Sequence, residues 1–136
     1  MRAHRIAEIL EGTSEEEMSL RRGDPSRIVG KLNHCLLGAV RFSAQGPWER
    51  HPDGDELLHV LEGELELTLL APEGRVELTV SEGSVFVVPR GLWHRSRPRG
   101  VAAMLFATPT RDGEISFADD PVLDQGPVDV GAPHRS

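Results

Sequence analysis

Residues 56–69 read ELLHVLEGELELTL, and this stretch decides the fold. From residue 64 to residue 69 polar and apolar side chains alternate strictly, the pattern of a strand with one wet face and one buried face. Glu62-Gly63 before it predicts a turn. The sequence Ala71-Pro72-Glu73-Gly74 after it also predicts a turn, since proline fixes φ and glycine permits positive φ. Alternation then resumes over residues 75–80, so a series of antiparallel strands is predicted.

Further short strands are expected on both sides of this stretch, with Gly30 and Gly38 as bulges or bends. They are residues 27–29, 32–42, 85–88 and 101–107. Many short strands joined by close turns are typical of an all-β barrel or sandwich. We therefore expect an all-β fold, a small antiparallel β-barrel.

The chain of 136 residues suits one domain. We expect the barrel to occupy residues 31–110. Residues 1–30 are expected to form an N-terminal arm that packs on it, with a short helix over residues 5–11 ended by Gly12. Residues 111–136 are expected to be an irregular segment that ends in a frayed tail from residue 126.

Composition excludes several classes of function. The net charge is −7 and no block of Lys and Arg stands out, which argues against nucleic-acid binding. No apolar run approaches the roughly 20 residues of a membrane span, and the N-terminus has no apolar signal core, so a cytoplasmic protein without membrane contact is expected. The single cysteine, Cys35, excludes an intrachain disulfide and a thiolate metal cluster. One local basic cluster comprises Arg90, Arg95, Arg97 and Arg99. It is interpreted as a solvated rim or as an anion contact at the mouth of a pocket.

Candidate metal ligands gather in residues 48–56, WERHPDGDE. In an extended strand Glu49 and His51 face the same side, with their Cα atoms about 6.8 Å apart. The turn sequence that follows would bring Glu56 back beside His51. His94, after a Pro-x-Gly turn, is a fourth candidate. Imidazole and carboxylate ligands suit a divalent ion of Fe, Mn, Ni or Zn.

Two motifs in this order resemble those of the cupin family. The first motif runs Gly, five residues, His-x-His, three or four residues, Glu, six residues, Gly; the second runs Gly, five residues, Pro-x-Gly, two residues, His, three residues, Asn. The matching residues are His51, Glu56 and Gly63 in the first motif, and Gly83, Pro89, Gly91 and His94 in the second. The chain thus resembles a small single-domain cupin over residues 36–107. The resemblance implies a double-stranded β-helix, or jelly roll, and a homodimer paired through edge strands and the N-terminal segment.

The chain departs from these motifs at two positions. Pro98 stands where the family often has Asn, and Glu49 stands where it usually has its first His. Three arrangements stay open: a neutral site of His51, His94 and both glutamates; an open site of His51, Glu56 and His94 with Glu49 turned away; and a barrel without metal. Glu56, or Glu49 if it is not a ligand, would serve as general base.

The other histidines and the tryptophans receive structural interpretations. His59 has the opposite strand parity to Glu56 and is expected on the outer face. His34 is expected to line the barrel interior as a satisfied core residue. Trp48 and Trp93 are expected to pack in the core or at its rim, with an aromatic wall of the pocket as the alternative.

The resemblance implies metal-dependent chemistry on a small organic molecule. The principal hypothesis is an oxygenase, such as a dioxygenase, or an isomerase-type enzyme. The alternative is a non-catalytic small-molecule-binding or sensor protein in which the metal is structural or absent. No Gly-x-Ser-x-Gly nucleophile motif and no phosphate-binding glycine loop is present.

Overall fold

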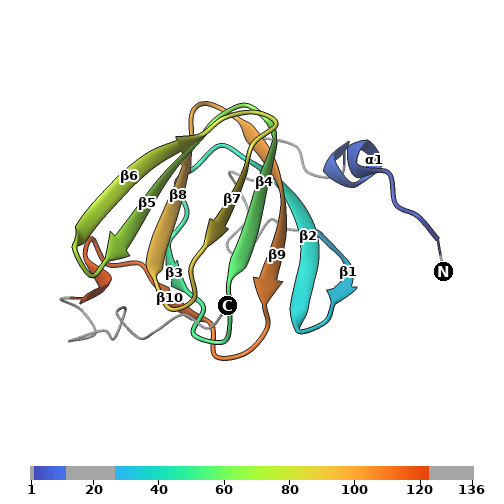
Figure 1. Ribbon diagram of the computed structural model, residues 1–136. Coiled ribbons are helices and arrows are strands. Elements are labelled where there is room, and N and C mark those ends of the chain that lie inside the picture. Colours follow the sequence, from blue (N-terminus) through green and yellow to red (C-terminus); the bar gives the residue numbers. More distant parts are fainter. Residues whose placement is uncertain (1, 12–26, 123–136) are drawn as a thin grey trace.

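Two five-stranded antiparallel sheets face each other across an apolar core (Figure 1). This computed structural model describes residues 2–11 and 27–122. The first sheet has the order β1 (Arg27–Leu32), β2 (Cys35–Phe42), β9 (Ala102–Pro109), β4 (Glu56–Glu62) and β7 (Val85–Val88). The second has the order β10 (Glu114–Ser116), β3 (Trp48–Arg50), β8 (Trp93–Pro98), β5 (Leu65–Ala71) and β6 (Gly74–Val80). The expected all-β jelly roll is confirmed.

The core follows from the alternation in residues 64–69. Leu65, Leu67 and Leu69 of β5 are buried, and they pack with Leu58 and Val60 of β4 from the facing sheet. Full burial of such a side chain contributes about 1.5–3 kcal/mol. The polar residues between these leucines point to the outer face of the second sheet.

The short helix α1 (Ile6–Glu11) packs against the outer face of the first sheet (Figure 1). Its one buried residue, Leu10, contacts Ala39 and Ala103, two small residues that leave room for it. Arg41 donates a hydrogen bond from Nη1 to the Leu10 carbonyl at 3.3 Å, so the helix is fixed by both apolar and polar contacts.

Gly30 and Gly38 behave differently. The register of β1 on β2 shifts between Ile28 and Gly30, so the expected irregularity at Gly30 is present. Gly38 lies in regular register with Phe106, and a Cβ there would come within 2.6 Å of the Phe106 ring and 2.8 Å of the Arg27 carbonyl. Gly38 is therefore a point of close approach.

The expected interior position of His34 is wrong. His34 is exposed in the turn between β1 and β2, where Asn33 adopts a positive φ of 53°. The chain reverses here, so residues 32–42 are not one strand. His59 is half-buried on the outer face, as expected, opposite Val85 and Leu105.

Trp48 and Trp93 are buried, but not in a pocket wall beside the candidate ligands. They alternate with Glu49 and His94 along β3 and β8, so they face the other side of the sheet. The packing interpretation of both tryptophans therefore holds.

Several expectations remain untested. β1 and β10 add pairing outside residues 31–110, and the division of the chain at residues 30 and 110 stays a prediction. The helix stop at Gly12 and the tail from residue 126 lie outside the described residues. No helix in the described ranges is long and apolar enough to cross a membrane.

Candidate metal centre

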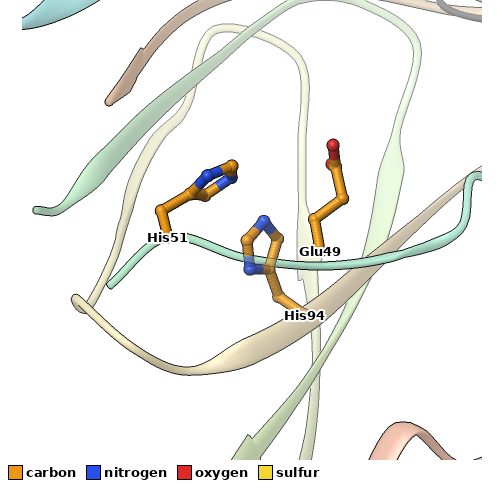
Figure 2. Close-up of side chains that lie close together, drawn as sticks. All are labelled: Glu49, His51 and His94. Atoms are coloured by element: carbon orange, nitrogen blue, oxygen red, sulfur yellow. The ribbon is translucent and has the colours of Figure 1, made fainter. Parts of the chain in front are cut away.

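Strands β3 and β8 place three of the four candidate ligands side by side. Glu49 is directly opposite His94 in register, and His51 follows two residues later on the same side. Figure 2 shows the side chains of Glu49, His51 and His94 extending to the same side of these strands. One potential ligand atom from each residue lies within 4.8 Å of those from the other two.

These side chains are largely removed from solvent. His51 is 6% exposed and His94 is 2% exposed, while Glu49 is half-buried. A buried imidazole loses the hydrogen bonds that water would give, so it needs another partner for its nitrogens.

Glu56, the first residue of β4, approaches from the other sheet. Its Oε1 lies 3.0 Å from His94 Nε2, and its Oε2 lies 3.3 Å from His51 Nε2. The Thr108 hydroxyl donates a short hydrogen bond to the same Oε2. Burial alone would raise the pKa of the Glu56 carboxyl, but the two neighbouring imidazoles together lower it well below its usual range. These surroundings therefore favour the ionised form of the buried Glu56 carboxyl.

The backbone orients His94. A peptide carbonyl can only accept, so His94 Nδ1 donates to the Leu92 carbonyl at 3.1 Å and Nε2 points towards the carboxylates. This is the arrangement of a metal-binding histidine, whose second nitrogen is held by a backbone or carboxylate acceptor. Burial opposes protonation of His94, but Glu56, and to a smaller extent Glu49, raise its pKa overall.

The surroundings of His51 indicate whether a divalent ion fits this site. Neither of its ring nitrogens makes a hydrogen bond to the described part of the chain, although both are buried. The 3.3 Å contact with Glu56 is within ion-pair distance but lacks hydrogen-bond geometry. A cation ligated by His51 would satisfy one nitrogen and lie beside two carboxylates. The donor set therefore fits a divalent ion with nitrogen and oxygen ligands.

The structure thus brings together all four residues singled out from the sequence: Glu49, His51, Glu56 and His94. Glu49 is not turned away from the histidines, because its carboxylate belongs to the close group. Sequence reasoning missed Thr108. Thr108 lies in β9, 52 residues from Glu56, and belongs to no motif. The only feature of the sequence that could have pointed to its contact with Glu56 is its parity along the strand.

The comparisons with known proteins agree with this fold. Residues 40–108 match a family described as the cupin domain. The uncharacterized protein YdbB of Bacillus subtilis (strain 168) is 38% identical over 70 residues, which are 51% of this chain and 58% of YdbB. The chain therefore matches just over half of the length of that relative.

Solved structures extend the likeness. A cupin-2 domain containing protein from Shewanella frigidimarina superposes with a TM-score of 0.56 at 22% identity, over 70% of this chain and 90% of that one. This likeness concerns the fold alone. Oxalate oxidase in complex with the substrate analogue glycolate superposes with a TM-score of 0.54 at 26% identity, over 63% of this chain and 47% of that one.

Proposed function

Because this chain belongs to the cupin family, we propose that it is a metal-dependent enzyme that acts on a small organic molecule, as an oxygenase or an isomerase-type enzyme. The observation that carries the proposal is His51, a buried imidazole whose two nitrogens have no hydrogen-bond partner in the described chain. It lies in a group with Glu49 and His94 whose ligand atoms are within 4.8 Å of one another. Such an arrangement is unfavourable without an electrophile to bind.

The proposed ligands are His51, His94, Glu49 and Glu56. Two carboxylates and two neutral imidazoles leave a divalent ion formally neutral, and their oxygens favour Mn(II) or Fe(II) over Zn(II). The bound ion would polarise a substrate oxygen and stabilise negative charge that develops there.

The protein's own residues hold this site in place. The Leu92 carbonyl fixes the His94 ring, and the Thr108 hydroxyl fixes the Glu56 carboxylate. Glu49 is only half-buried and can accept a proton from a substrate at its carboxylate oxygen, if another ligand replaces it. Glu56 is the second candidate for the general base, although its low pKa makes it a weak one.

The likeness to oxalate oxidase supports a small, oxygen-rich substrate. That protein is solved with glycolate, a substrate analogue with a carboxylate and a hydroxyl group. A ligand of this kind can place an oxygen on the ion, and small organic acids are therefore the first substrates to test.

The test uses the full chain, stripped with a chelator and reloaded separately with Mn, Fe, Ni and Zn. We expect one ion per chain for the preferred metal, a raised melting temperature, and turnover or oxygen uptake with a member of a panel of organic acids, phenols and enols. His51→Ala is the inactive comparison, and His59→Ala on the outer face is the matched control. Metal-replete protein that turns over no panel member would contradict the enzyme proposal.

A binding or sensor protein is the second candidate. Glu49 in the place of a histidine favours it, because a second carboxylate leaves the ion formally neutral and therefore a weaker Lewis acid. Water relaxation by the Mn(II) form separates the two functions. An exchangeable water on the ion supports catalysis, and a coordination shell without one supports the sensor or a structural metal.

We also propose a homodimer built on the first sheet. Val85 and Val87 of the edge strand β7 are 55% and 48% exposed, and they lie opposite His59 and Leu57. An apolar edge strand is stabilised by covering it with a second chain. Val87→Glu should shift the mass measured by light scattering from dimer to monomer, whereas Val76→Glu on β6 should not. A monomeric wild type would contradict the dimer.

A cytoplasmic location stays a prediction, to be checked by cell fractionation.

A further inference from the structure

A hollow of about 350 Å3 lies on the outer face of the second sheet, over β8, β5 and β6. Arg95 and Arg97 line it, and they alternate along β8 with His94, so the hollow faces away from the candidate metal centre. Its volume is in the range of sites for small organic molecules. The proposed function does not use this hollow.

The charges in the hollow do not balance. Arg97 Nε donates to Glu66 at 2.8 Å, and Arg75 Nε donates to Glu77 at 3.4 Å. Arg95, in contrast, contacts no carboxylate within the described residues, and it is only half-buried. One positive charge is therefore left for an anion.

Arg95 is also held in a fixed place. Its guanidinium lies 4.5 Å from the centroid of the Trp48 ring, and the Arg75 guanidinium lies 6.0 Å from the same ring. Trp48 is 1% exposed and its Nε1 donates to the Asp119 carbonyl at 3.2 Å. A guanidinium stacked on an immobile ring keeps its in-plane N–H groups for a ligand and loses little freedom on binding.

Uncharged polar groups also line the hollow, besides the paired Glu66 and Glu77. Thr68 is directly opposite Arg95 in register, Thr79 is opposite Glu66, and Gln45 completes the lining beside them. Their hydroxyl and amide groups both donate and accept, which suits the hydroxyl groups of a ligand.

We propose that this hollow is a second binding site, for a small hydroxylated organic anion. The carboxylate or phosphate of the ligand accepts hydrogen bonds from the Arg95 guanidinium, and its hydroxyl groups contact Thr68 and Thr79. The site is separate from the metal centre and its occupation requires no metal.

The test measures anion binding to the metal-free full chain at constant ionic strength. The probes are tartrate and glycerol phosphate, which carry hydroxyl groups beside a carboxylate or a phosphate, with acetate and chloride as comparisons. We expect a saturable change of tryptophan fluorescence, since Trp48 lies under Arg95, and a rise of the melting temperature with the same probe. The stronger probe tells which anion the site prefers.

Three variants decide the outcome. Arg95→Ala should weaken binding at least about tenfold, because it removes a charge-assisted donor. Arg95→Lys should restore part of it, which excludes a simple loss of folding. Arg99→Ala should bind like the wild type, because Arg99 is exposed, pairs with Glu64 and Glu66, and does not line the hollow.

Two results would overturn the proposal. One is equal binding by the wild type and Arg95→Ala. The other is the absence of saturable binding of either hydroxylated probe up to about 10 mM. His51→Ala keeps this result distinct from the proposed function: it should lose metal binding and retain anion binding.

Discussion

His51 is the residue whose surroundings are least consistent with a metal-free protein. A buried polar atom without a hydrogen bond costs about 1–3 kcal/mol, and neither ring nitrogen of His51 makes one within the described residues, although Nε2 lies 3.3 Å from Glu56 Oε2. Natural chains retain such a group where it has a task that only the polar atom can perform. We therefore expect His51 to contribute to metal binding and not to the free energy of unfolding of the metal-free chain.

The variant His51→Leu tests this expectation. The variant removes the nitrogens that lack hydrogen bonds and keeps an apolar side chain of similar size, while Glu56 loses the His51 contact but keeps His94 and Thr108 as partners. The metal-free variant should therefore be about as stable as the metal-free wild type. It should gain nothing on addition of metal. Urea unfolding with and without metal measures both effects. His59→Leu is the control and should keep the metal-induced stabilisation; a large loss of stability in metal-free His51→Leu would contradict the argument.

Glu49→Gln tests whether the carboxylate opposite His94 is a ligand. An amide is a much weaker ligand than a carboxylate for a divalent ion, so the affinity for Mn(II) or Fe(II) should fall at least about tenfold. Competition with a chelator measures it. Glu77→Gln, on the outer face, is the matched control. An unchanged affinity would assign the site to His51, Glu56 and His94 alone.

At the scale of elements, β3 positions Glu49 in the candidate site although the strand has only three residues. This strand lies between β10 and β8, and its Glu49 is directly opposite His94 of β8 in register. On the outer face Arg50 lies 5.1 Å from the Trp93 ring centroid, and Arg95 lies 4.5 Å from that of Trp48. These two stacked pairs flank the Glu49–His94 pair, and each contributes about 0.5–1 kcal/mol or more when shielded from water. They are expected to fix the spacing of the two ligands.

Gly38→Ala tests the close approach of β2 to its neighbours. The new methyl group would meet the Phe106 ring at 2.6 Å and the Arg27 carbonyl at 2.8 Å, so a backbone as well as a side chain must shift. We expect a loss of about 1–3 kcal/mol in the free energy of unfolding, measured with urea. Gly30→Ala is the matched control, since nothing lies within 4 Å of its added Cβ. Equal effects of the two changes would contradict this packing.

Elements were predictable where one face is buried and the other is wet. The alternation over residues 64–69 predicted the strand β5, which runs from Leu65 to Ala71, and its buried face, because period two leaves one choice of face. The turn at His34 was not predicted, because no Gly or Pro marks it and Asn33 alone supplies the positive φ. The proximity of the four candidate ligands was predictable from spacing, and their role as ligands stays a prediction. The contact of Thr108 depends on the register of β9 and cannot be derived from local sequence.

For the whole molecule, pH acts on stability through the buried Glu56–His94 pair. The pKa of Glu56 is lowered, so its contribution is present above its ordinary value of 4.5 and is lost as the pH falls. The pKa of His94 is raised, so its contribution is complete below its ordinary value of 6.5 and is lost as the pH rises through the folded-state pKa. The pair therefore stabilises the metal-free chain most between these two values.

Metal should change this profile. Urea midpoints of the metal-free protein are expected to fall on both the acid and the alkaline side. With metal the alkaline fall should disappear, because the ion binds neutral histidine and competes with the proton. Identical profiles with and without metal would contradict a site that contains His94.

The two sheets contribute separate parts of the candidate centre: Glu56 begins β4 in one, whereas Glu49 and His94 lie opposite each other in the other. An ion held by all of them can bind only after the sheets have closed on each other, which is late in folding for a chain with such distant contacts. In denaturant-jump kinetics, metal should then slow the unfolding limb and leave the refolding limb nearly unchanged. The ion would then stabilise the folded chain kinetically. The lifetime of the folded state would depend on the metal concentration, whereas the rate of folding would depend on it only weakly.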